Sequence, residues 1–138
     1  GQVLYDDLPR YLATADAFVT ASVTEVHPLS VIEAQAAGLP VLGIQSPGVS
    51  DTVKDGETGI LVQEEDLALF TAKMVRLVTD REGLLKMGIE ARESAQAYAY
   101  NRTSQILLDH YQHLIEEVAG RERSPWQRLR VKLNDIVT

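Results

Sequence analysis

The stretch of residues 17–44 constrains the fold of this chain more than any other. Apolar runs at residues 17–22 and 40–44 predict two short strands, and residues 29–37 between them predict a helix. Gly38 is placed to end that helix, because glycine readily adopts the left-handed conformation that follows many helices. A strand, a loop, a helix and a strand within about 28 residues predict a βαβ unit, whose two strands are parallel.

Two carboxylates lie at the start of the predicted helix. Glu25 falls in the loop after the first strand, and Glu33 falls about one turn into the helix. In open α/β sheets, ligands bind in the crevice at the carboxyl ends of the strands. The helix start also offers unpaired N–H groups and the positive end of the helix dipole, which suit a phosphate. This loop is therefore the predicted ligand site.

Local signals predict the elements around this unit. We expect a helix that is capped by Asp6 or Asp7 and ends near Asp16. The apolar run at residues 17–22 is expected to be a central strand. The next expected elements are a Pro-Gly turn at 47–48, a short helix at 49–53, a turn at 54–56 and a third strand at 59–62.

The rest of the chain has helical spacing of its apolar residues. The expected helices span residues 66–79, 80–97 and 101–119. Asn101 is expected to cap the third of them. Gly83 and Gly88 weaken the prediction of the second, at about 1 kcal/mol each relative to alanine. Residues 120–125 are expected to be a linker and residues 126–137 a last amphipathic helix.

Length and composition exclude several classes of protein. A chain of 138 residues forms one domain at most. It has no cysteine, so a metal would need oxygen and nitrogen ligands, and no such cluster is evident. The net charge of −7 argues against nucleic-acid binding. There is no long apolar run and no signal-peptide pattern, so we expect a cytoplasmic protein.

The charge is unevenly distributed. Residues 120–138 hold five basic and two acidic side chains, a net charge of +3, so the remaining residues carry −10. The apolar residues of this tail fall on one helical arc, with most of the basic residues outside it. Such a helix can pack on another part of the protein or on another chain, or can lie on an anionic membrane surface.

The predicted ligand site, residues 23–28 between the first strand and the helix, is called the ligand loop below. It belongs to a longer series of sequence blocks. Seven residues separate Glu25 from Glu33, and the helix ends in Glu33-Ala-x-Ala-Ala-Gly38-x-Pro40. This pattern resembles the E-x7-E signature of the retaining glycosyltransferases of family 4, which have two Rossmann-like domains in the GT-B architecture. The likeness covers roughly residues 1–118 and extends to blocks at residues 8–16, 46–51 and 55–62.

The resemblance implies an α/β fold. We expect a Rossmann-like parallel sheet with flanking helices, the C-terminal half of a GT-B donor domain, over residues 1–119, followed by C-terminal helices. Residues 120–138 are expected to form the linker and the basic amphipathic helix. A complete domain of this kind has about six parallel strands and this chain predicts three. We therefore expect a C-terminal fragment, which lacks the acceptor domain and the first half of the donor domain.

The resemblance also implies an activity. Members transfer a sugar from a nucleoside diphosphate to an acceptor hydroxyl with retention of configuration, using no metal or other cofactor. Glu25 is implied as the catalytic residue, whose carboxylate accepts hydrogen bonds from hydroxyls of the donor sugar. Glu33 is implied to hold the ribose hydroxyls. The alternative is that Glu25 is a solvated loop acid, and that Glu33 is a surface residue of a helix or a charge near the helix start.

Backbone groups complete the implied donor site. The amides of Leu29, Ser30 and Val31 are expected to face the diphosphate. The hydroxyl of Ser30 could add a bond or could only cap the helix. His27 could reach the sugar or the phosphate, or could simply be exposed.

The loop departs from the common family pattern. That pattern has Glu-Gly-Phe-Gly-Leu-Pro, whereas this chain has Glu25-Val-His-Pro-Leu-Ser30. Both glycines are absent, and Pro28 removes one backbone donor. The number of backbone bonds to the donor and the identity of its sugar, carried on UDP or GDP, are therefore left open.

Other functions and partners follow from the same features. One alternative is a sugar-nucleotide epimerase of the same architecture, and another is a non-catalytic interaction module with a vestigial crevice.

A transferase would meet its acceptor sugar or lipid through the missing N-terminal domain, and this fragment alone would be inactive. The basic tail would supply any peripheral membrane contact. An exposed strand edge would favour a homodimer of the fragment.

Overall fold

The computed structural model describes residues 2–63 and 66–122, the last three of these by their backbone alone. The described residues form two compact units, which divide between Tyr98 and Ala99. The first unit contains every predicted site residue. Each unit is described by itself.

A three-stranded parallel sheet lies at the centre of the first unit. Its order is β1 (Phe18–Thr20), β2 (Val41–Ile44) and β3 (Gly59–Val62). Val41 pairs with Phe18 on one side and with Gly59 on the other. The predicted parallel βαβ unit is thus confirmed. The expectation that residues 17–22 form a central strand is wrong for the described sheet, where β1 is at the edge.

The position of β1 explains why the prediction failed. The first three residues of β2 are buried, whereas Val19 in the middle of β1 is 45% exposed. A short apolar run indicates a strand that buries side chains, but it does not indicate how many neighbours the strand has.

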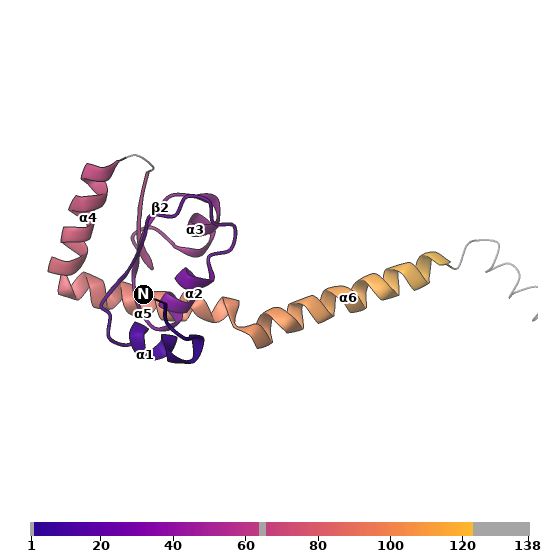
Figure 1. Ribbon diagram of the computed structural model, residues 1–138. Coiled ribbons are helices and arrows are strands. Elements are labelled where there is room, and N and C mark those ends of the chain that lie inside the picture. Colours follow the sequence, from indigo (N-terminus) through magenta and orange to yellow (C-terminus); the bar gives the residue numbers. More distant parts are fainter. Residues whose placement is uncertain (1, 64–65, 123–138) are drawn as a thin grey trace, which may run out of the picture. The chain divides into compact units, whose positions relative to one another are not determined.

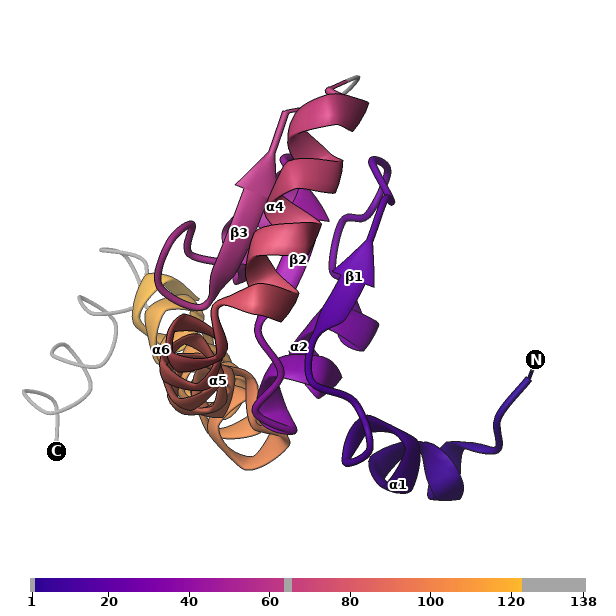
Figure 2. The ribbon, with the colours of Figure 1, turned by 90° about the vertical axis from the view of Figure 1, so that its left-hand side faces the viewer.

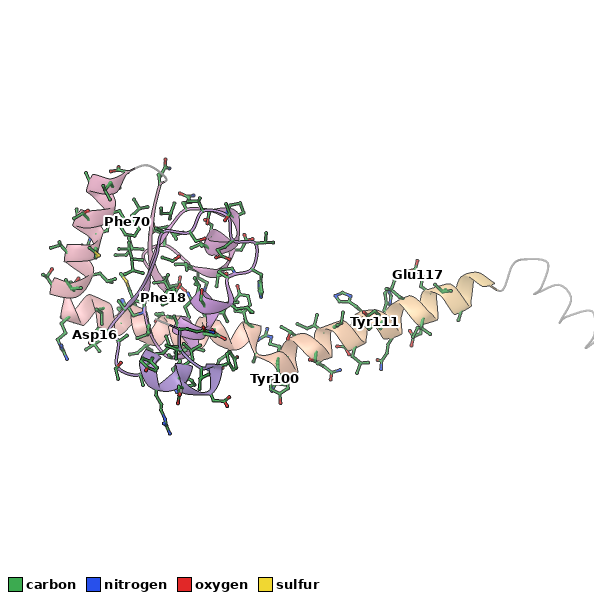
Figure 3. The ribbon with its side chains drawn as sticks, viewed as in Figure 1. Asp16, Phe18, Phe70, Tyr100, Tyr111 and Glu117 are labelled. Atoms are coloured by element: carbon green, nitrogen blue, oxygen red, sulfur yellow. The ribbon has the colours of Figure 1, made fainter. Side chains whose placement is uncertain are left out.

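Helices cover both faces of the sheet. Figure 1 shows the sheet between α4 (Leu67–Thr79) on the left and α2 (Leu29–Ala36) and α3 (Pro47–Thr52) on the right, and Figure 2 shows α4 in front of the sheet with α2 behind it. On the α2 face, Phe18 packs against Val31, Val41, Val49 and Val53. On the α4 face, Phe70 packs against Leu42, Ile60, Val62 and Leu77 (Figure 3). The predicted α/β class is therefore confirmed as a three-layer arrangement.

The N-terminal helix is shorter than predicted. A 3-10 turn, η1 (Tyr5–Asp7), leads into α1 (Leu8–Leu12), which stops well before Asp16. Neither Asp6 nor Asp7 caps α1 through its side chain. At the other end, the Thr14 hydroxyl donates to the Tyr11 carbonyl over 2.8 Å.

The short helix α3 begins earlier than predicted. Pro47 is its first residue, so Pro47 and Gly48 form the first helical turn and not a preceding turn. Proline fits this position because its missing N–H has no helical partner there. The predicted turn at residues 54–56 is confirmed, with Gly56 at φ +77°.

Two predicted helices follow the sheet. Asp66 caps α4 by accepting from the Leu69 amide over 2.8 Å. Asp80 caps α5 (Arg81–Ala95) by accepting from the Gly83 amide over 2.9 Å. A 3-10 turn, η2 (Gln96–Tyr98), then ends the first unit.

The second unit contains α6 (Tyr100–Glu122). Asn101 is not its cap: the helix starts one residue earlier, with a bond from the Thr103 amide to the Ala99 carbonyl, and the Asn101 side chain accepts from Arg102. Residues 120–122 are helical and not part of a linker. Residues 123–125 and the predicted helix at 126–137 lie outside the described residues. Within the described ranges, no helix combines the length and apolarity needed to cross a membrane.

A glycine in α5 lets the end of α2 pack directly on that helix. Gly38 follows α2 with φ +83°, as predicted. Its carbonyl lies so close to Gly88 of α5 that a Cβ on Gly88 would overlap it. Gly88 lowers the helix propensity of α5, but no other residue leaves room for this contact. The tertiary contact therefore outweighs local propensity here.

We predict that Gly88→Ala destabilises the protein. Helix propensity alone would give a gain of about 1 kcal/mol, but overpacking against the Gly38 backbone costs about 1–3 kcal/mol, so we expect a net loss of up to about 2 kcal/mol. Urea unfolding followed by circular dichroism measures the change. Ser94→Ala, in the same helix, is the control and should change the free energy of unfolding little. A more stable Gly88→Ala variant would contradict the packing.

Candidate functional site

The loop between β1 and α2 holds Glu25 at two points. The Gly48 amide donates to the Glu25 carbonyl over 3.0 Å. The Ser22 hydroxyl donates to Oε1 of the Glu25 carboxylate over 3.1 Å, and the Ser22 amide donates in turn to Oγ1 of Thr20. The Glu25 side chain is half-buried, and its Oε2 has no hydrogen bond within the described residues. One carboxylate oxygen is thus fixed, and the other is available to a ligand.

Gly48 allows α3 to lie against this loop. A Cβ at Gly48 would come within 2.5 Å of the Glu25 carbonyl oxygen and 2.7 Å of the Val26 carbonyl. Such distances are well inside van der Waals contact, so only glycine fits. The Gly48–Glu25 bond thus places the start of α3 beside the loop.

The start of α2 presents fewer free amides than expected. Pro28, which is buried, is the N-cap residue. Its carbonyl accepts from the amides of Val31 and Ile32 over 3.0 and 3.1 Å. Val31 therefore already has a backbone partner, and its side chain is in the core. Leu29 and Ser30 have amides with no partner among the described residues, and both side chains are exposed.

Ser30 is not the cap of α2. It is the second residue of the helix, and α2 has no side-chain cap. That alternative for Ser30 is therefore wrong, because Pro28 already sets the helix start two residues earlier. The uncapped start leaves the free amides of α2 to solvent or to a ligand.

The Glu33 side chain is held by a residue of η1. This half-buried side chain accepts from the Tyr5 hydroxyl, with 3.2 Å between that oxygen and Oε1. A pocket of about 400 Å³ adjoins this pair. Its lining residues come from η1, α1 and α2: Tyr5, Leu8, Pro9, Leu12, Ala13, Glu33, Ala36 and Ala37.

His27 contacts a residue that the sequence did not single out. Its exposed ring lies 6.0 Å from the ring of Tyr98 in η2, with 56° between the ring planes. The Tyr98 hydroxyl donates to the Asp51 carbonyl at the end of α3 over 3.1 Å. Tyr98 thereby joins the ligand loop to α3. Tyr5 and Tyr98 were both missed, because each is far along the chain from the residue it contacts.

The charged side chains of the candidate site are the carboxylates of Glu25 and Glu33. Among the described residues, no group of three or more histidine, aspartate or glutamate side chains is placed to hold a metal ion. Outside the site, the exposed Lys54 ammonium donates to Glu57 over 2.9 Å, and this hydrogen bond and charge raise the pKa of Lys54. The site therefore consists of two carboxylates on either side of an uncapped helix start.

Comparison with known proteins matches most of the chain to one family. The family model described as Glycosyl transferases group 1 matches residues 1–102. The D-inositol 3-phosphate glycosyltransferase of Nocardia farcinica is 36% identical over 113 residues, which are 82% of this chain and 25% of that protein. The chain spans about a quarter of the length of the curated relatives it matches.

Solved structures agree with this match. Sucrose-phosphate synthase from Thermosynechococcus elongatus superimposes with a TM-score of 0.79 at 29% identity, over 85% of this chain and 30% of that one. A mutant of S. aureus TarM, solved with Fondaparinux, alpha-GlcNAc-glycerol and UDP, gives a TM-score of 0.69 at 26% identity, over 78% of this chain and 22% of that one.

We predict that Gly48→Ala displaces the ligand loop. The added methyl group must push away the backbone of Glu25 and Val26, with a loss of about 1–3 kcal/mol in the free energy of unfolding. Amide chemical shifts from residues 22–28 should move, whereas those of α4 should stay. Ser50→Ala, in the same helix, adds no atom and is the control. Unchanged loop shifts in Gly48→Ala would show that α3 does not constrain Glu25.

Proposed function

The chain belongs to the glycosyl transferases group 1 family, and from this premise we propose that it forms the donor-binding part of a retaining glycosyltransferase. In the proposed reaction, the bond between the anomeric carbon and the diphosphate oxygen breaks, and a bond from that carbon to the oxygen of an acceptor hydroxyl forms on the same face. The nucleoside diphosphate leaves and takes up the proton of that hydroxyl. The Nocardia farcinica relative is named as a glycosyltransferase, and the TarM structure contains UDP. Both support a nucleotide-sugar donor for this chain.

The observation that carries the proposal is the arrangement at the start of α2. Glu25 has one carboxylate oxygen fixed by Ser22 and one without a partner, and the amides of Leu29 and Ser30 have no partner among the described residues. A fixed acceptor beside free donors suits a ligand that carries both hydroxyls and a negatively charged group. A sugar diphosphate has this combination.

We assign the diphosphate to the amides of Leu29 and Ser30. Negative charge grows on the leaving diphosphate as the glycosidic bond breaks, and preorganised N–H groups at a helix start stabilise such charge. Val31 contributes less in this scheme than the sequence suggested, because its amide donates to Pro28. No metal is required for this stabilisation, since the amides and the helix dipole supply it.

The two carboxylates have separate roles in the proposal. Glu25 accepts from hydroxyls of the donor sugar through its free oxygen, and it acts on the reacting sugar without becoming a nucleophile. Glu33 accepts from the ribose hydroxyls, because an ionised carboxylate can receive two O–H groups at once. His27 stands beside Glu25 in the loop and is a second candidate for the sugar or phosphate. The acceptor site lies outside these residues in this proposal.

Ligand binding to Glu25→Ala and Glu33→Ala tests these roles. Saturation-transfer NMR on the longest soluble form of the protein would titrate UDP-glucose, GDP-mannose, UDP and GDP. Losing a hydrogen bond to a charged group weakens binding by roughly ten- to a hundredfold. Glu25→Ala should weaken only the nucleotide sugar, because the free nucleotide has no sugar for Glu25. Glu33→Ala should weaken both the nucleotide sugar and the free nucleotide.

Glu93→Ala is the matched control, because Glu93 is an exposed acid on α5 that belongs to no part of the site. It should bind like the unaltered protein. If the unaltered protein binds none of the four ligands, the proposed donor site is wrong. Equal effects of Glu25→Ala on UDP and on UDP-glucose would remove the assignment of Glu25 to the sugar.

A further inference from the structure

We propose that Tyr5 is a positioning residue for nucleoside recognition and that it acts by holding the carboxylate of Glu33. The proposal rests on the proposed function, in which Glu33 receives the ribose hydroxyls. It adds a residue that lies outside every block of the sequence resemblance.

The hydrogen bond from Tyr5 to Glu33 links two separate elements. The Tyr5 hydroxyl of η1 donates to Oε1 of Glu33 on α2, a residue 28 positions further along the chain. Tyr5 is 77% exposed, and this bond is the one polar contact that its side chain makes among the described residues. The hydrogen bond to Glu33 therefore sets the orientation of the Tyr5 hydroxyl, since no surrounding side chains enclose it.

Holding one oxygen of Glu33 favours a two-point contact with a diol. A carboxylate has about four acceptor positions on its two oxygens. Tyr5 occupies one of them on Oε1, so Oε2 and the rest of Oε1 can accept from two neighbouring hydroxyls. A free glutamate side chain loses much rotamer freedom when a ligand orders it. Because Tyr5 already orders Glu33, less conformational entropy of this side chain is lost when a ligand binds.

The pocket beside Glu33 offers an apolar surface for the part of the nucleoside next to the diol. Its other lining residues are apolar, apart from the hydroxyl of Tyr5, and its volume is about 400 Å³. Tyr5 thus contributes to the site twice: its ring forms part of the apolar wall, and its hydroxyl orients the carboxylate. A ligand with a diol at Glu33 would place the adjoining part of the nucleoside against that wall.

Comparing UDP with 2′-deoxy-UDP tests the proposal. The probe pair differs only in the 2′-hydroxyl, which two-point binding to Glu33 requires. In Tyr5→Phe, which keeps the ring and removes only the hydroxyl, we expect UDP to bind about three- to tenfold more weakly, because UDP must then order the Glu33 side chain itself. Affinity for 2′-deoxy-UDP should fall less, so the preference for UDP should shrink. Isothermal titration calorimetry on the longest soluble form of the protein gives both affinities.

Tyr11→Phe is the matched control. Tyr11 is an exposed tyrosine of the neighbouring helix α1, is absent from the pocket lining and has no hydrogen bond through its hydroxyl among the described residues. It should bind both nucleotides like the unaltered protein. If Tyr5→Phe weakens UDP and 2′-deoxy-UDP equally, Tyr5 only shapes the pocket and the positioning role is overturned.

Two further outcomes separate this inference from the proposed function. If the unaltered protein prefers UDP, Glu33→Ala abolishes the preference and Tyr5→Phe leaves it intact, the role of Tyr5 is wrong and the proposed function stands. If the unaltered protein binds neither nucleotide, or if Glu33→Ala keeps the preference, the ribose assignment of Glu33 fails, and the inference fails with it.

Discussion

The contact between the end of α2 and α5 is the constraint on which the first unit depends. At Gly38 and Gly88 two backbones meet without a side chain between them. This contact fixes one end of α2, and the buried Pro28 and Val31 fix the other. Because α2 carries Glu33 and the free amides, its position sets the geometry of the whole candidate site.

Polar bonds from distant elements then hold the site in place. Gln35 of α2 is fully buried, and its amide group donates to the Thr52 carbonyl over 3.3 Å and to the Thr58 hydroxyl over 3.1 Å. Leaving this buried NH2 group without partners would be costly, so these bonds specify how α2 meets the turn before β3. The backbone amide of Gly48 in α3 also holds the Glu25 carbonyl.

The unusual sequence of the ligand loop has a structural counterpart. Where the common family pattern has its second glycine, this chain has Pro28 at the N-cap position of α2, and no side chain caps the helix start. The loop gains a fixed proline and loses one amide donor. The aromatic contact between His27 and Tyr98 supports the loop from outside. A loop of different sequence thus presents a carboxylate and free amides at the helix start.

The sequence alone determined the features that depend on neighbouring residues. Apolar runs identified the three strands, Asp66 and Asp80 marked two helix starts, and Gly38 marked a helix end. Each of these signals acts over a few residues, through side-chain spacing, capping bonds or backbone conformation. The two carboxylates were also evident, since their spacing relative to the helix start can be read along the chain.

Only the tertiary structure decided the features that depend on distant residues. The edge position of β1 depends on how many strands lie beside it. The need for a glycine at position 88 depends on the backbone of Gly38, which lies against it. The bonds from Tyr5 to Glu33 and from Tyr98 to Asp51 join residues 28 and 47 positions apart. Local sequence patterns extend over one or two helical turns. Contacts across such separations form only when the packed layers bring the two segments together.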